Sequence, residues 1–144
     1  MRYMWSVPGD QTTPQNFTSQ AVTRGIRVQV SARYSADGSE PVRDRWEFPY
    51  TVTIANESPD TVQLISRHWI ITDASNTVEE VKGLGVVGRQ PVLEPGEAYE
   101  YTSLCRLRTP FGSMHGSYQM VTAGGERFDA AIAPFGLSAP YTVH

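Results

Sequence analysis

The chain has 144 residues, a formal net charge of -3 at pH 7 and a single cysteine, Cys105. This length fits one domain with its own hydrophobic core, and the small charge gives no electrostatic case for a nucleic-acid or membrane surface. The lone cysteine excludes an intrachain disulfide, and no apolar run approaches the ~20 residues of a membrane-spanning helix. We therefore expect a cytoplasmic protein without nucleic-acid or membrane partners.

The first 22 residues are polar, contain proline and glycine, and show no hydrophobic period. This composition predicts a flexible extension over 1–22 and an ordered domain over 23–144. Pro8 and Gly9 interrupt the apolar residues near the start, which argues against a cleaved secretion signal.

Alternating apolar and polar residues then predict a series of strands. The first covers 26–34 and is followed by a turn cluster over 35–41. The second covers 46–54, where Pro49 indicates an edge strand or a bulge, because proline cannot donate to a ladder. The third, over 61–72, changes its apolar phase by one residue, which favours a β-bulge or burial of both faces.

The remaining strands are short and separated by turn residues. They cover 78–81, 99–107 and 114–120, and a glycine pair then predicts a hairpin turn into a last strand or two over 128–137. Seven or eight short strands with no helical period predict an all-β fold. We expect two antiparallel sheets in an immunoglobulin- or fibronectin type III-like sandwich, with a closed barrel as the alternative.

One segment is rich in glycine, and Gly83, Gly85 and Gly88 have the G-x-G-x-x-G spacing of a dinucleotide-binding loop. That motif needs a helix after its last glycine, whereas Pro91 and Pro95 leave no room for one. Two interpretations remain. The glycines let backbone N–H groups form an anion-binding nest, or they shape an irregular crossing between the sheets.

The nest hypothesis gives the chain a second candidate function, the binding of a nucleotide or phosphate. Arg89 follows the last glycine, and Arg106 and Arg108 join it if their strand folds back past the loop. Arginine offers a planar donor fork that suits phosphate. The candidate anion-binding residues are Gly83, Gly85, Gly88, Arg89, Arg106 and Arg108.

The sequence predicts no catalytic residue, no metal site and no cofactor. Ser113 and His115 share a strand face, but no orienting acid and no G-x-S-x-G elbow accompany them. The histidines, His68 among them, lack a recurrent ligand spacing. Alternation places Cys105 with apolar neighbours, which favours a small core residue over a reactive thiolate. We expect a protein without enzymatic activity.

Several segments read together resemble the ApaG domain family. They are TRGIRVQV over 23–30, LISRHWIITDA over 64–74, EEVKGLGVVGRQPVLEPGEAYEYTS over 79–103, GSMHGSYQM over 112–120 and FDAAIAPFGL over 128–137. The resemblance implies a fibronectin-like sandwich. It also implies an association with cobalt and magnesium efflux in bacteria, and a role as an appended interaction module in eukaryotic proteins.

Two features depart from the family pattern. Leu104 stands where the family has glycine, and Arg106 and Arg108 stand where it more often has proline and an acidic or polar residue. Sheet edges of a sandwich accept partner strands, and loops add specificity. From the resemblance and the fold together we expect a non-catalytic binding module with a protein partner, and a homodimer is a further option.

Overall fold

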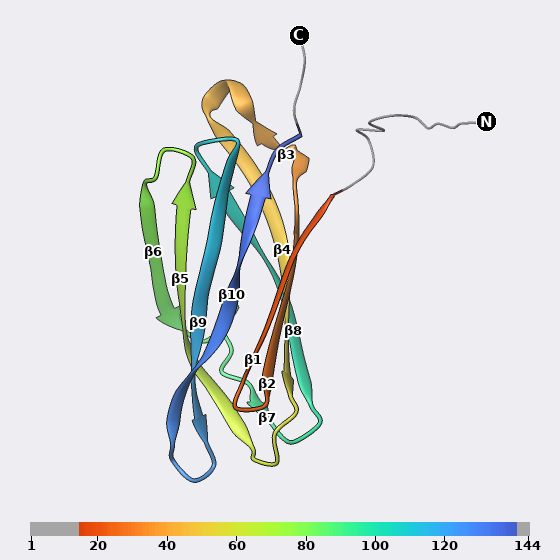
Figure 1. Ribbon diagram of the computed structural model, residues 1–144, viewed down its shortest axis with the longest axis vertical. Helices are drawn as coiled ribbons and strands as arrows, with labels where there is room; N and C mark the ends of the chain where they lie inside the picture. The colour runs from red at the N-terminus through yellow and green to blue at the C-terminus, as the bar shows by residue number, and fades with distance from the viewer. Residues whose placement is uncertain (1–14, 141–144) are drawn as a thin grey trace, which may run out of the picture.

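The computed structural model describes residues 15–140, which fold into two antiparallel sheets packed face to face (Figure 1). Nearly every described residue lies in a strand or a tight turn. The predicted all-β sandwich is therefore confirmed. The described residues contain ten strands, because three segments that were not expected to form strands do so.

The first sheet has five strands. They are β1 (Asn16–Thr23), β2 (Ile26–Arg33), β3 (Ser35–Glu40), β4 (Arg45–Asn56) and β8 (Ala98–Leu107). β1 pairs with β2, β2 with β4, and β4 with β8, while β3 continues the course of β2 along β4. A short 3-10 helix, Pro41–Arg43, joins β3 to β4.

The second sheet also has five strands. They are β5 (Val62–Asp73), β6 (Val78–Leu84), β7 (Val92–Leu93), β9 (Phe111–Thr122) and β10 (Arg127–Ser138). The order across the sheet is β10-β9-β5-β6, and β7 pairs with β5 beyond the end of β6. The predicted glycine hairpin joins β9 to β10, where Gly125 has φ +90°.

The core lies between the two sheets and takes alternate residues from each strand. Phe48 and Tyr118 are fully buried, and Trp69 packs edge-on against Tyr50, Tyr118 and Phe135. Burying each such side chain contributes about 1.5–3 kcal/mol, so this layer supplies most of the stabilisation. The phase slip predicted in β5 is a bulge: Leu64 pairs with Met120 and Ser66 with Gln119.

The boundary predicted at Thr23 is wrong for residues 16–22. These residues form most of β1, which pairs with β2 from Asn16 to Thr23. Alternate β1 side chains are half-buried, and Phe17 packs against the core. The Thr23 hydroxyl accepts a hydrogen bond from the N–H of Ala131 on β10. The rest of the predicted extension, 1–14, lies outside the described residues, as does 141–144.

The segment predicted as a turn over 35–41 forms β3 and the start of the 3-10 helix instead. Of the two options that Pro49 indicated, the edge position is wrong, because β4 has neighbours on both sides. A register shift does occur nearby, between the Ser35–Glu47 and Glu40–Arg45 pairs of β3 with β4. Pro49 lies where β4 changes partner, between the Ala32–Tyr50 pair with β2 and the Ser35–Glu47 pair with β3. A proline there removes no bond from a continuous ladder.

The two sides of the sandwich differ. On one side β1 of the first sheet packs against β10 of the second. On the other side β6 and β8 are the outer strands, and among the described residues each pairs with a single neighbour. The glycine-rich segment follows β6 and therefore lies on this open side (Figure 1).

Candidate functional site

The loop over 83–89, here called the glycine loop, is held by backbone hydrogen bonds, both to β5 and within the loop. The N–H of Gly85 donates to the carbonyl of Ile65 at 2.8 Å, and Val86 and Arg89 exchange two N–H···O bonds of 2.8 and 2.9 Å. A nest needs successive N–H groups free to meet one anion. Three of the N–H groups in this loop already donate to carbonyls of the protein.

A cation, rather than an anion, is bound by this loop within the protein. Arg67 on β5 donates its Nη1 to the carbonyls of Leu84 and Gly85, at 3.0 and 2.9 Å. A Cβ on Gly83 would lie 2.8 Å from that Nη1. The loop therefore directs two carbonyl oxygens at an arginine, and Gly83 provides the space for its guanidinium.

The other two glycines are explained by their backbone conformations. Gly85 has φ +64°, and a Cβ there would overlap the carbonyl oxygen of Arg89. Gly88 has φ +76° with open space around it. These are conformations that glycine adopts at little cost. The structural interpretation of the three glycines thus accounts for each of them.

Val87, at the tip of the loop, breaks the pattern. It has φ 47°, which is a genuine outlier for a β-branched residue. Its neighbour Val86 is fully buried and anchors the loop in the core, whereas Val87 is 65% exposed. Leu84 and Val92 on either side of the loop are also exposed. We call Leu84, Val87 and Val92 the apolar loop surface.

The three candidate arginines do not come together. Arg106 and Arg108 line a hollow with Asp73 and Glu79, at the end of β6 where the strand begins. The glycine loop lies at the other end of β6, and the seven residues of that strand place its two ends about 20 Å apart. The strand that carries Arg106 therefore does not fold back past the loop.

Arg106 and Arg108 instead belong to a group of exposed arginines at the end of the first sheet. A hollow there is lined by Arg43, Asp44, Arg45, Arg106, Leu107 and Arg108. Arg106 donates to Glu47 at 3.2 Å, and Arg45 to Glu40 at 2.9 Å. The Arg45–Glu40 pair is exposed on both sides and contributes about 0–1 kcal/mol, whereas Glu47 is buried beneath Arg106.

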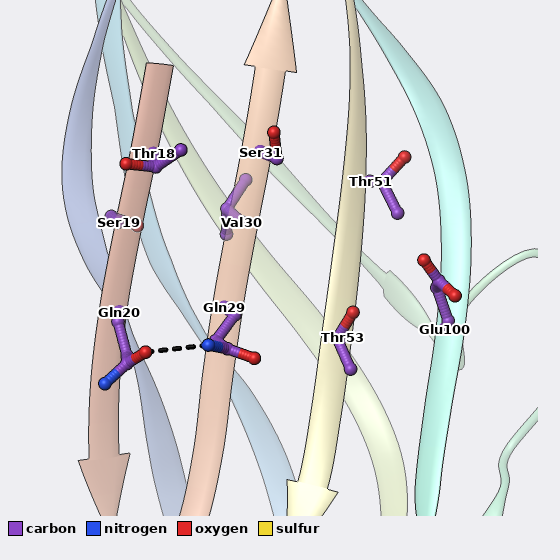
Figure 2. Close-up of a pocket in the computed structure, with 9 residues that line it drawn as sticks. All are labelled: Thr18, Ser19, Gln20, Gln29, Val30, Ser31, Thr51, Thr53 and Glu100. Carbon is purple, nitrogen blue, oxygen red and sulfur yellow. Dashed lines mark hydrogen bonds between the residues drawn. The ribbon is translucent and has the colours of Figure 1, made fainter. Parts of the chain in front are cut away.

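A wider hollow lies on the outer face of the first sheet (Figure 2). Its lining is mostly Thr, Ser and Gln, and Glu100 is the one charged residue among them. Gln29 donates to Gln20 at 2.8 Å, and the hydroxyls of Thr51 and Thr102 are 2.9 Å apart. These groups bond to one another across the strands, which is typical of a solvated sheet face.

The buried thiol of Cys105 and the buried hydroxyls of Tyr101 and Tyr118 are unsuited to proton transfer near neutral pH. Burial raises the pKa of Cys105 to about 12, so its thiol stays protonated, and the predicted core role of Cys105 is confirmed. Burial also raises the pKa values of Tyr101 and Tyr118, whose hydroxyls are hydrogen-bonded to each other in the core. A general acid or base needs a pKa close to the working pH.

Ser113 and His115, which were predicted to share one face of a strand, both lie on β9. His68 on β5 is hydrogen-bonded to Glu80 on β6, with 2.9 Å between Nε2 and Oε2. Residues 15–140 include no cluster of three or more His, Cys, Asp or Glu arranged to hold a metal ion. In the same range no helix is long and apolar enough to cross a membrane.

Reasoning from the sequence missed Arg67 and Val87, the two residues that set the shape and surface of this loop. The sequence does contain a signal for Arg67. After the phase slip it lies two residues before the inward-facing Trp69, so both side chains lie on the same face of the strand. Nothing in the sequence pattern marks the backbone conformation of Val87. That conformation comes from the exchange of hydrogen bonds between Val86 and Arg89.

The chain is similar to a known domain family and to two proteins named Protein ApaG. The model of the ApaG domain family matches residues 36–122. Protein ApaG of Thiobacillus denitrificans is 54% identical over 119 residues, which cover 83% of this chain and 94% of that protein. Protein ApaG of Anaeromyxobacter sp. is 56% identical over 126 residues, which cover 88% of this chain and 99% of that protein.

The fold of this chain is also similar to that of a solved structure. The crystal structure of a Bordetella pertussis protein described as ApaA matches with a TM-score of 0.78 and 50% identity, over 81% of this chain and 95% of that one. The family model covers more than half of the 144 residues, and the identities are well above what a shared fold alone produces. By sequence and by structure, this chain belongs to the ApaG domain family.

Proposed function

We propose that this chain is a non-catalytic module that binds another protein through the apolar loop surface of Leu84, Val87 and Val92. The observation that supports the proposal is the backbone of Val87. A β-branched residue in the left-handed region costs of order 1–3 kcal/mol, and Val87 contributes little to the core because its side chain is mostly exposed. Asparagine or glycine would adopt the same turn at lower cost.

The loop is built to present Val87 rigidly. Val86 is buried in the core, and the Arg67 guanidinium on β5 donates hydrogen bonds to the carbonyls of Leu84 and Gly85. A partner that binds a rigid loop pays little entropy to order it. Exposed apolar side chains on such a loop, beside charged residues such as Arg89, fit the anatomy of a protein interface with an apolar centre and a polar rim.

The alternative, phosphate or nucleotide binding at Gly83, Gly85, Gly88 and Arg89, has less support. Three loop N–H groups are committed to carbonyls, and Arg106 and Arg108 lie at the far end of β6. The link to cobalt and magnesium homeostasis rests on the family resemblance. We also propose a cytoplasmic location, in keeping with a single buried cysteine.

Quantitative co-purification tests the proposed function. The tagged full chain, Val87→Asp and Val42→Asp are used to capture proteins from the same lysate. Val42 is 96% exposed on the 3-10 helix, so its variant adds the same charge away from the loop. We expect a protein captured by the wild type and by Val42→Asp to be depleted with Val87→Asp. Equal capture by all three forms would contradict the proposal.

A further inference from the structure

The free edge of β6 carries a set of unpaired backbone groups that the pairing with β5 defines. Asp73 donates to the carbonyl of Thr77, and Gly85 donates to the carbonyl of Ile65. In an antiparallel pair, residues that exchange hydrogen bonds alternate with residues that do not. Odd-numbered residues of β6 therefore bond to β5, and even-numbered residues direct their N–H and C=O groups to the free edge. These are Val78, Glu80, Lys82 and Leu84.

The sequence of β6, VEEVKGL, complements itself when two copies run antiparallel about Val81. In that register Glu80 faces the partner's Lys82 and Lys82 faces the partner's Glu80. Val78 faces the partner's Leu84, Glu79 faces the partner's Gly83, and Val81 faces the partner's Val81. Opposite charges and apolar pairs directly across a ladder both stabilise it.

The same register is the one that the backbone requires. The facing pairs of even-numbered residues are those whose N–H and C=O groups point to the free edge, so each pair exchanges hydrogen bonds. Val81 falls on the two-fold axis in a pair that exchanges none. The carbonyl of Leu84 already accepts from Arg67, and a carbonyl has a second lone pair for another donor. A shift by one residue would break both the backbone pairing and the charge pairing.

Exposure of the strand ends supports this arrangement. Val78 and Leu84 are 57% and 75% exposed at the two ends of an outer strand, which leaves apolar surface in water. Pairing about Val81 brings each against the other in the second copy. Within residues 15–140, β6 lies at the margin of the second sheet and no further strand pairs with it, which leaves the edge open in this part of the chain (Figure 1).

We propose that β6 pairs with β6 of a second copy of this chain, about a two-fold axis at Val81, so that the two second sheets become one continuous sheet. The inference goes beyond the proposed function, since it uses a different surface and a different partner. Only Leu84 belongs to both. Isologous pairing of this kind is the commonest symmetry of homodimers.

Disulfide trapping tests the register on the full chain. Two residues facing each other in a pair without hydrogen bonds have Cα atoms about 4.5 Å apart, which is within disulfide range. Val81→Cys should therefore form a cross-linked dimer under mild oxidation. Val78→Cys is the matched control, because residue 78 of one copy lies about 20 Å from residue 78 of the other. Cys105 is buried and does not interfere.

Charge reversal tests the same contact in solution without cross-linking. By sedimentation, Glu80→Lys alone and Lys82→Glu alone should raise the dimer dissociation constant about tenfold, because each faces a like charge twice. The double variant should restore it. Glu100→Lys, on the outer face of the first sheet, should change little.

A chain that remains monomeric in sedimentation up to high concentration would overturn the proposal, and so would equal cross-linking of Val81→Cys and Val78→Cys. Either result would leave this edge free for a strand of a different protein. The effect of Val87→Asp on the capture of a partner protein does not depend on this pairing, because Val87 lies outside β6. The two proposals thus fail separately.

Discussion

Arg67 and Gly83 face each other across the β5–β6 pair, so closely that a Cβ on Gly83 would lie 2.8 Å from the Arg67 Nη1. This contact links the glycine spacing in the sequence to the hydrogen bonds that hold the loop. It also explains why a dinucleotide-like motif occurs where no helix follows: the first glycine makes room for a side chain of the same protein.

Gly83→Ala should displace the guanidinium and weaken its bonds to Leu84 and Gly85, lowering the free energy of unfolding by about 1–3 kcal/mol. Urea denaturation measures this loss. The control is the double-mutant cycle with Arg67→Ala, because without the guanidinium the added methyl group has room. If Gly83→Ala costs as much with Arg67→Ala present as without it, the proposed contact is not the cause.

Val87→Asn should stabilise the protein, since asparagine tolerates the left-handed backbone that Val87 adopts. We expect a gain of about 1 kcal/mol, which for a domain of this size raises Tm by about 3–6 °C. Calorimetry measures the change. Val42, which is also exposed, lies outside the set of positive-φ residues, so Val42→Asn should leave Tm almost unchanged. A lower Tm for Val87→Asn would remove the strain argument.

Stability should fall at alkaline pH, and Cys105 should contribute to the fall. Its pKa is raised by burial from 9.0 to about 12, so the unfolded chain loses this proton before the folded chain does. The stabilisation is complete below pH 9 and is lost as the pH rises toward 12, at up to about 1.4 kcal/mol per pH unit. Denaturation at several pH values measures the slope.

Cys105→Ala provides the comparison for that slope. It should lower stability at pH 7, because it leaves a small cavity, and should make the decline between pH 9 and 12 less steep. Part of the decline in stability should remain in both the wild type and Cys105→Ala, because the pKa values of Tyr101 and Tyr118 are also raised in the folded chain. Identical slopes would show that the thiol does not titrate differently in the two states.

The glycine loop should not bind nucleotides. Calorimetric titration with ATP, GTP and diadenosine tetraphosphate should give no saturable heat at millimolar concentrations, because three of the loop N–H groups already donate to carbonyls of the protein. Arg89→Ala and Arg108→Ala serve as paired variants on the two separate arginine positions. Saturable heat that only Arg89→Ala abolishes would restore the phosphate hypothesis.

The sequence predicted the fold better than the site, for a physical reason. Strand alternation is local, so β2 and the bulge in β5 are visible without the structure. β1 was missed because Phe17 is its one large inward-facing side chain, and its stability comes from pairing with β2. Whether Arg106 meets Arg89 depends on sheet topology, which no spacing along the chain contains.

Photo-cross-linking in living cells tests whether the apolar loop surface contacts a partner protein. A photoreactive amino acid is placed at Val87, with the matched control at Val42 on the 3-10 helix. We expect a discrete cross-linked protein from position 87 that position 42 does not give. The same products from both positions, or none from position 87, would contradict it.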